Sequence, residues 1–320
     1  MPQCVLIDTD PGVDDALALL LALNSPELEV KAITTVCGNV DGDTATSNLY
    51  TVLDLLPGPY PALAKGAERP LVGNPSFADH VHGANGLGGK RSERENKALI
   101  SPDLPPLSSR PGAEEILYQL EICPQPLTLI TLGPLTNIAL ALDRAPDMGR
   151  KIRRMVMMGG AYTGPGNITP AAEFNIFADP EAADLVFRFG LPITAVGLDV
   201  TRQVRLKRQM LNEWVQASGS PLRHKIQEWT SHSLNYMHEL DGEASIPLHD
   251  PLAVLVCMDP NLVGTEDMHV VVETKGQSTR GMTLADRRPI LQKWKKKPNL
   301  RICTWVNGRQ SLNRFLEGIP

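Results

Sequence analysis

Short apolar runs alternate along the chain with longer segments in which apolar side chains recur at helical spacing. The apolar runs predict buried strands at Cys4–Ile7, Glu29–Val36, Leu127–Leu132, Arg154–Met158 and Ile193–Gly197. The other segments predict helices at Asp14–Asn24, Thr44–Leu56, Ala113–Ile122, Leu135–Ala145 and Pro180–Phe189. Strands that alternate with helices in this way predict an α/β fold with a mainly parallel open sheet, helices on both faces and a Rossmann-like core.

The remainder of the chain departs from this alternation. Prolines interrupt the pattern over Pro57–Pro70, and the polar, glycine-rich stretch Asn74–Arg110 predicts loop. The polar segment Leu206–His238 predicts a helical cap. Late strands, partly antiparallel, are expected at His269–Thr274, Gly281–Ala285 and Arg301–Val306. Because no internal repeat or low-complexity linker divides the chain, we expect one domain over residues 1–320.

Composition narrows the classes of partner. The 320 residues are 42% hydrophobic and 21% charged, as in an ordinary globular protein. A formal charge of -5 disfavours a nucleic-acid partner, which usually requires a basic surface. We interpret the basic run Lys293–Lys297 as a solvated surface stretch.

Cysteine usage and the N-terminus indicate a cytoplasmic protein. Five scattered cysteines without a CxxC pair predict neither a disulfide framework nor a zinc site, and favour a reducing compartment. The N-terminus lacks the basic and apolar regions of a signal peptide. No apolar run approaches the ~20 residues that span a bilayer, so we expect no membrane partner.

The segment DTDPGVDDA places Asp8, Asp10, Asp14 and Asp15 directly after the first predicted strand. In open α/β sheets, ligands bind beyond the carboxyl ends of the strands. Helix capping explains one or two of these aspartates but not four. Two carboxylates ~4 Å apart repel by roughly 4 kcal/mol at an effective dielectric near 20, so the cluster needs protons or a cation. Oxygen ligands favour a hard cation, calcium or magnesium.

Polar residues also follow later predicted strands. Asn39 follows the second strand, and a Gly-Pro turn in TLGPLTN, residues 131–137, could expose a backbone carbonyl. Asn167, Glu173 and Asn175 follow a fourth strand. Asp250 of the HDP tripeptide precedes an apolar helix, where an N-cap followed by proline is a strong structural explanation. Each residue alone fits a turn or a cap, whereas several at one sheet edge predict a polar pocket.

These motifs together resemble the inosine-uridine type of nucleoside hydrolase. The resemblance runs from the first strand to about Val256, with every motif in the expected order: DTDPGVDDALAL, GN at Gly38, HG at His82, GPLTNIA from Gly133, GNITPAAEFNIFADPEAA from Gly166, and HDPLAV from His249. It implies an enzyme that hydrolyses the N-glycosidic bond of ribonucleosides to ribose and free base, with a calcium-bound water activated by an aspartate.

The resemblance also assigns roles to matching residues. Calcium would be held by Asp10, Asp15, Asp250 and the backbone carbonyl of Leu132. Asp10 would be the base that accepts the proton of the water, and His249 the acid for the leaving base, with His82 close to that base. The ribose would be bound by Asp14 at the 2′-hydroxyl, Asn175 at the 3′-hydroxyl, Asn167 and Glu173 at the 5′-hydroxyl, and Asn39 in support of Asp14.

Substrate preference is less constrained. Aromatic residues before HDP close over the base in broad-specificity relatives, and the candidates here are Trp229, His232, Tyr236 and His238. No tryptophan pair of the purine-specific branch is evident around His82, which favours a pyrimidine or mixed inosine-uridine preference. The resemblance further implies a cytoplasmic homodimer or homotetramer in purine and pyrimidine salvage.

Three alternatives remain open. The chain could hydrolyse a modified nucleoside, or could be a non-catalytic nucleoside-binding protein on the same fold. An aspartate-nucleophile phosphatase also begins with a strand and two aspartates one residue apart, as Asp8 and Asp10 are. In that class a DxDGT-like continuation is expected, whereas PGVDDA follows here.

Overall fold

A central sheet of eight strands organises the chain. The computed structural model describes residues 2–90, 103–289 and 296–320. The strand order is β3-β2-β1-β4-β5-β6-β12-β9, and only the β12–β9 pair is antiparallel. In sheet order the strands are β3 (Ala62–Lys65), β2 (Leu28–Thr35), β1 (Gln3–Thr9), β4 (Leu127–Thr131), β5 (Ile152–Met158), β6 (Ile193–Val196), β12 (Leu300–Val306) and β9 (Val263–Met268). The predicted α/β fold class is confirmed.

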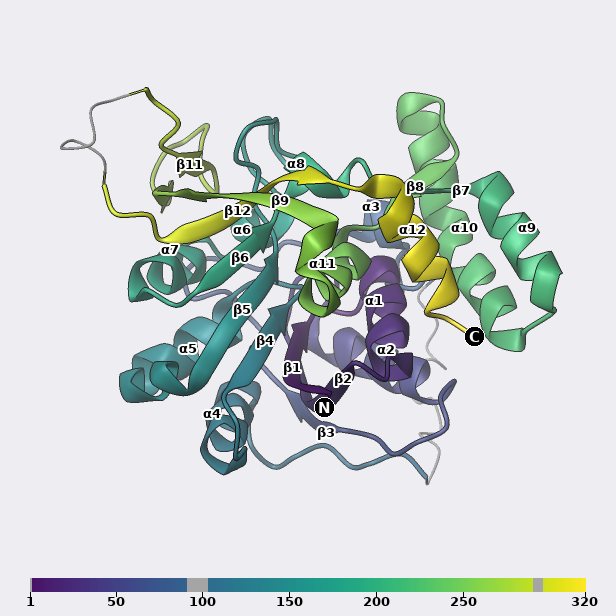
Figure 1. The fold of residues 1–320 in the computed structure, drawn as a ribbon, viewed down its shortest axis with the longest axis horizontal. Helices are drawn as coiled ribbons and strands as arrows, with labels where there is room; N and C mark the ends of the chain where they lie inside the picture. The colour runs from purple at the N-terminus through teal and green to yellow at the C-terminus, as the bar shows by residue number, and fades with distance from the viewer. Residues whose placement is uncertain (1, 91–102, 290–295) are drawn as a thin grey trace.

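Helices cover both faces of this sheet (Figure 1). One core includes Val5 and Ile7 of β1, the other includes Leu6, because successive side chains of a strand point to opposite faces. The first core is closed by α1 (Val13–Asn24), α2 (Gly42–Leu53) and α11 (His249–Met258). The second is closed by α4 (Gly112–Ile122), α5 (Thr136–Arg144) and α7 (Pro180–Phe189). Burial on both faces explains why the strands read as continuous apolar runs.

The predicted helical cap is also present. It consists of α9 (Arg208–Ser218) and α10 (Pro221–Asp241), flanked by the antiparallel pair β7 (Arg205–Lys207) and β8 (Ser245–Pro247). α9 and α10 lie to one side of the sheet in Figure 1. α10 packs on the short helix α3 (Asp79–His82). The helix α3 lies within the stretch Asn74–Arg110, which was predicted as loop. The described residues also form α6 (Phe174–Ala178), α8 (Leu198–Thr201), α12 (Gly308–Glu317) and the 3-10 turns Pro146–Lys151 and Pro260–Leu262.

Some elements differ from the predicted ones. β3 lies inside the proline-rich stretch, and β9 carries exposed polar residues, so neither has the apolar run that marks the other strands. Two of the predicted late strands, β10 (Val270–Val272) and β11 (Thr283–Ala285), pair with each other in antiparallel orientation. The N-cap interpretation of Asp250 was wrong, because α11 already begins at His249 with Leu248 as its N-cap. The basic run at 293–297 lies largely outside the described residues. Across the described ranges, no helix is long and apolar enough to cross a membrane.

Candidate active site

The carboxyl edge of the sheet has a topological switch point at β1 and β4. The chain proceeds from β1 to β2 and β3 on one side, and from β4 to β5 and β6 on the other. Loops that diverge in this way leave a crevice at the strand ends. A cavity of about 440 Å³ occurs there, lined by the predicted residues Asp14, Asn39, His82, Leu132, Asn167, Glu173, Asn175, His249 and Asp250. Asp10 and Asp15 are fully buried and are not among the lining residues.

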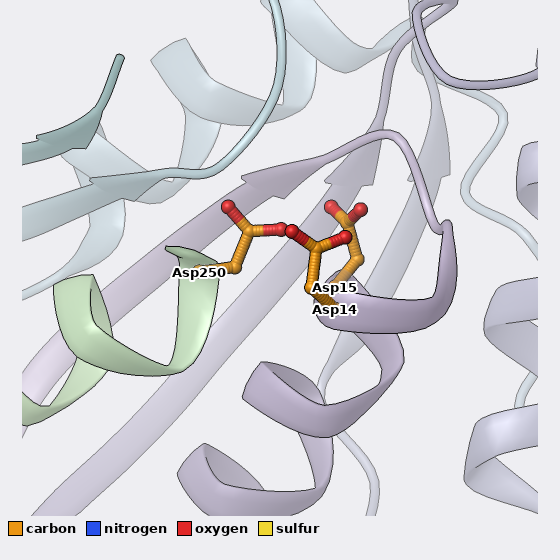
Figure 2. Close-up of side chains that lie close together, drawn as sticks. All are labelled: Asp14, Asp15 and Asp250. Carbon is orange, nitrogen blue, oxygen red and sulfur yellow. The ribbon is translucent and has the colours of Figure 1, made fainter. Parts of the chain in front are cut away.

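Three carboxylates converge where α1 and α11 begin. Asp14 and Asp15 lie in the first turn of α1, and Asp250 in the first turn of α11, which packs against α1. Each offers an oxygen, and these oxygens all lie within 4.8 Å of one another. Figure 2 shows the three side chains pointing toward one another. Two helices that start side by side therefore bring residues 235 positions apart (250 minus 15) into one cluster.

The cluster is electrostatically costly without a cation. Burial, followed by the neighbouring charges of Asp14 and Asp15, raises the pKa of Asp250 well above its usual value. Burial and Asp15 raise the pKa of Asp14 to about 7. Oδ1 of Asp10 and Oδ1 of Asp14 are buried without a hydrogen-bond partner among the described residues. Orphaned oxygens in an all-oxygen donor set fit a hard divalent cation.

The carboxylate of Asp10 lies against the backbone of two glycines, Gly38 and Gly133. Its Oδ2 accepts a hydrogen bond from the backbone N–H of Asn39 at 2.6 Å. A Cβ at Gly38 would lie 2.0 Å from Oδ2, and a Cβ at Gly133 would lie 2.5 Å from Oδ1. Any larger residue at either position would displace the carboxylate. The GN and GP pairs of the motifs are thus explained by the space that Asp10 requires.

Asp15 is held by four hydrogen bonds. Its Oδ1 accepts from the Thr9 hydroxyl at 2.5 Å and from the backbone N–H of Asp10 at 3.2 Å. Its Oδ2 accepts from the backbone N–H of Gly12 at 3.0 Å and from Nδ2 of Asn39 at 2.9 Å. Asn39 was expected to support Asp14, but its hydrogen bonds go to Asp15 and Asp10 instead. Asn39 therefore fixes two of the predicted metal ligands relative to each other.

Asp8, the first aspartate of DTDPGVDDA, has a structural role. Its Oδ1 accepts hydrogen bonds from the Thr34 hydroxyl and from Nδ2 of Asn137, the latter at 2.8 Å. Asn137 also donates to the Thr35 carbonyl at 2.9 Å and accepts from the N–H of Ala67 at 2.8 Å. Burial raises the pKa of Asp8 to about 7. This network joins α5 to β1, β2 and the chain after β3, and its one local signal in the sequence is the asparagine of TLGPLTN.

Three of the predicted ribose ligands, Asn167, Glu173 and Asn175, line another part of the cavity. Glu173 caps α6, with its carboxylate accepting from the N–H groups of Gly160 at 2.9 Å and Asn175 at 2.9 Å. Oδ1 of Asn167 accepts from the N–H of Phe174 at 2.9 Å. Nδ2 of Asn175 donates to the carbonyl of Leu132 at 2.5 Å. The Leu132 carbonyl is therefore adjacent to a residue expected to bind the ribose.

Both predicted histidines are neutral. Nδ1 of His82 accepts a hydrogen bond from the N–H of Val13 at 3.1 Å, and burial lowers its pKa to about 4. Nδ1 of His249 lies 2.7 Å from the Thr201 hydroxyl, and burial, followed by the charge of Arg202, lowers its pKa to about 3. The pKa of His249 therefore lies below the reference value of about 6.5 for histidine. Its imidazole can still donate a hydrogen bond in its neutral form.

Several lining residues were not predicted. Arg202 and Arg205, before and within β7, line the cavity, as does His80, whose ring packs edge-on against Tyr236 at 5.6 Å. Tyr236 is the one aromatic candidate of the cap that reaches the cavity: Trp229 is buried in the core, and His232 and His238 are absent from the lining. The arginines lie outside every motif, so the sequence carried no local signal for them.

The chain matches a known protein family. The family model described as "Inosine-uridine preferring nucleoside hydrolase" matches residues 5–313. A pyrimidine-specific ribonucleoside hydrolase, RihA, of Salmonella schwarzengrund is 42% identical over 283 residues, which is 88% of each chain.

Solved structures show the same relationship. A plant nucleoside hydrolase superposes with a TM-score of 0.89 at 31% identity, over 100% of this chain and 99% of the other. A purine-preferring ribonucleoside hydrolase from Gardnerella vaginalis superposes with a TM-score of 0.88 at 31% identity, over 99% and 98% of the two chains. The chain therefore belongs to the inosine-uridine preferring nucleoside hydrolase family and is a ribonucleoside hydrolase.

Proposed function

We propose that this hydrolase prefers pyrimidine ribonucleosides, or uridine and inosine together, and uses calcium held by the aspartate cluster. The observation that carries the metal proposal is the convergence of Asp14, Asp15 and Asp250, with the orphaned oxygens of Asp10 and Asp14 beside them. Calcium accepts 6–8 oxygen ligands in flexible geometry, which suits carboxylates from separate helices.

The pyrimidine preference is supported by two observations. The curated relative of 42% identity is named pyrimidine-specific, whereas the purine-preferring structure is 31% identical. Among the described residues that line the cavity there is no tryptophan.

We assign the metal to Asp10, Asp15, Asp250 and the carbonyl oxygen of Leu132. Bound calcium would supply Lewis-acid chemistry, lowering the pKa of water and orienting the 2′- and 3′-hydroxyls. Asp14 and Asn175 bind those hydroxyls, and Asn167 and Glu173 bind the 5′-hydroxyl. Asp14 belongs to the same carboxylate cluster, so the 2′-hydroxyl would meet it directly beside the metal ligands.

The chemical step follows from the protein's own groups. Oδ1 of Asp10 has no hydrogen-bond partner in the described part of the chain, so it can accept the proton of the attacking water. The oxygen of that water bonds to C1′ while the C1′–N bond breaks through an oxocarbenium-like ribose. Neutral His249, with Nδ1 beside the Thr201 hydroxyl, donates a hydrogen bond from Nε2 to the departing base. The electron pair of the broken bond leaves with the base.

The experiment is ribose release from uridine, cytidine, inosine and adenosine, with and without a chelator. We expect release that the chelator abolishes and calcium restores, with uridine and cytidine, or uridine and inosine together, first in rank. Release that persists in the chelator would contradict the metal proposal, and adenosine ranked first would contradict the preference. No release from any of the four would favour the alternatives, a modified nucleoside or a binding protein.

We further propose a cytoplasmic homodimer or homotetramer of single-domain subunits, acting in nucleoside salvage. The net charge of -5 and the scattered cysteines support the compartment. Sedimentation of the purified protein tests the assembly, and a monomer would contradict it.

A further inference from the structure

The chain between β5 and α6 approaches the cavity without regular secondary structure. Residues 159–171 form neither helix nor strand. Backbone N–H and C=O groups in such a segment need partners from elsewhere in the protein. Residues 162–167, termed the 162–167 loop, include the cavity residues Gly166 and Asn167.

Asp199, in α8, holds the first half of this loop. Its carboxylate accepts hydrogen bonds from the backbone N–H groups of Tyr162 at 2.9 Å, Thr163 at 2.7 Å and Gly164 at 3.1 Å. The Thr163 hydroxyl donates a further one. Burial acts to raise the pKa of Asp199, but the hydrogen bonds from the Thr163 hydroxyl and from the backbone outweigh it, so the pKa lies below its usual value. The carboxylate is therefore charged at neutral pH, and its hydrogen bonds are charge-assisted.

Arg202, directly after α8, holds the second half. Its guanidinium donates from Nη1 to the carbonyl of Pro165 at 3.0 Å and from Nη2 to the carbonyl of Gly166 at 2.6 Å. Two donors in one rigid plane fix both carbonyls, which a lysine ammonium cannot reproduce. Asp199 and Arg202 thus bind consecutive residues of the loop. Asp199 accepts hydrogen bonds from the loop's N–H groups, and Arg202 donates hydrogen bonds to the loop's carbonyls.

The next residue in the chain is Asn167. Its Oδ1 is engaged by the N–H of Phe174, and the residue lines the cavity beside Glu173. Asp199 does not line the cavity, and its side-chain hydrogen bonds go to the 162–167 loop. Thr201 lies between Asp199 and Arg202 in the sequence, and its hydroxyl is 2.7 Å from Nδ1 of His249. One short segment therefore supports two walls of the site.

We propose that Asp199 and Arg202 are positioning residues that fix Asn167 for the 5′-hydroxyl of the ribose. This rests on the proposed function, in which Asn167 binds that hydroxyl. The pair would then set how strongly the enzyme distinguishes a riboside from its 5-deoxy counterpart, although neither residue need touch the hydroxyl.

The test compares p-nitrophenyl riboside with p-nitrophenyl 5-deoxyriboside, whose leaving group makes slow rates measurable. Asp199→Asn keeps the side chain's size but replaces one acceptor oxygen with a donor. We expect kcat/KM for the riboside to fall about tenfold, the equivalent of one hydrogen bond to the substrate, and that for the 5-deoxyriboside to stay within about twofold. The preference for the 5′-hydroxyl should therefore nearly disappear.

Asp179→Asn is the matched control. Asp179 is likewise a carboxylate that accepts backbone N–H groups, from Leu71 at 2.8 Å and from Ala182 in the first turn of α7 at 3.0 Å, although Asp179 is buried and Asp199 half-buried. Its remaining hydrogen bond comes from the Thr136 hydroxyl at 2.7 Å, away from the 162–167 loop. This variant should lower the melting temperature and leave the ratio of the two substrates unchanged.

A double-mutant cycle locates the effect. If Asp199 acts through Asn167, then Asp199→Asn added to Asn167→Ala should cause almost no further loss on the riboside. Equal losses on both substrates, or fully additive losses in the cycle, would overturn the proposal. If Asp199→Asn does not fold, Arg202→Lys decides by the same ratio and by the same cycle with Asn167→Ala, because Arg202 also lines the cavity. Wild-type enzyme that hydrolyses neither riboside would instead refute the proposed function, and one that hydrolyses both equally would refute the role of Asn167.

Discussion

At the scale of single residues, the site depends on how the carboxylate of Asp10 is held. The carboxylate is buried and accepts one backbone N–H from Asn39, and its other oxygen has no hydrogen-bond partner among the described residues. Burial, followed by the charge of Asp15, raises its pKa well above the usual value. A raised pKa favours a carboxylate that takes up a proton, as a general base must.

Replacing Asp10 by alanine should therefore remove turnover while the fold persists. We expect kcat for uridine to fall by about 10³-fold or more, because a general base and a proposed metal ligand are lost together. Steady-state kinetics with calcium in excess measures this, and circular dichroism checks the fold. The control is Asp8→Asn, in the preceding strand but outside the cavity, which should keep most of the turnover. Near-native rates for the Asp10 variant would refute its role.

The glycines beside Asp10 give a second prediction. In Gly133→Ala, the added Cβ would lie 2.5 Å from Oδ1, so the carboxylate must move. A displacement of about 1 Å in a catalytic group can cost about 100-fold in rate, and we expect a loss of that order in kcat. Gly42→Ala is the matched control, because its Cβ would meet its nearest neighbour at an ordinary 3.5 Å. A Gly133→Ala variant as active as the control would show that the Asp10 carboxylate does not need the space beside Gly133.

The motif residues could be predicted because residues of the same chemical type cluster at nearby positions of the sequence. Four aspartates within eight residues exceed what capping explains, and the GN and HDP motifs follow in order along the chain. Asp199 and Arg202 could not be predicted in this way. Each looks like an ordinary charged residue after a strand, and only the folded 162–167 loop reveals the backbone groups that they hold.

At the scale of elements, α5 is joined to the sheet through Asn137. This side chain bonds Asp8 of β1, the Thr35 carbonyl of β2 and the N–H of Ala67. In Asn137→Ala these buried groups lose a partner, so we expect a loss of about 2–4 kcal/mol in the free energy of unfolding. Urea denaturation measures it. Asn24→Ala, which removes one bond to the Leu20 carbonyl at a helix end, should cost about 1 kcal/mol or less. Equal losses in the two variants would contradict the bridging role.

In the central sheet, the six strands between the two edges were predicted, whereas the edge strands β3 and β9 were missed. β1, β4 and β5 are apolar because both faces are covered, and their predicted bounds differ from the observed ones by a few residues at most. β9 pairs at the sheet edge and exposes Thr265, Glu266 and Asp267, so its sequence has no strand pattern. β3 is short and lies between prolines. Edge strands are specified by their neighbour more than by their own side chains.

At the scale of the whole molecule, the switch point between β1 and β4 gathers residues from across the chain into one acidic site. The half-buried Asp14 and the buried Asp250 have raised pKa values, so the folded protein holds protons that the unfolded chain has released above about pH 4. When the folded state binds more protons, the free energy of unfolding falls as the pH rises. Without metal, stability should therefore decline from about pH 4 up to the raised pKa of Asp14, about 7.

Calcium should reverse this loss, because a cation replaces the protons between the carboxylates. At a calcium concentration about 100 times the dissociation constant, the folded state gains about 2.7 kcal/mol, or about 5 °C in melting temperature. The gain should be larger at pH 7.5 than at pH 5, since only the charged carboxylates bind the metal. Thermal melts with calcium and with chelator at the two pH values measure it. Asp250→Asn should melt independently of calcium, because it removes one charge of the cluster and one proposed ligand. A calcium effect of equal size in that variant, or one that shrinks as the pH rises, would place the cation elsewhere.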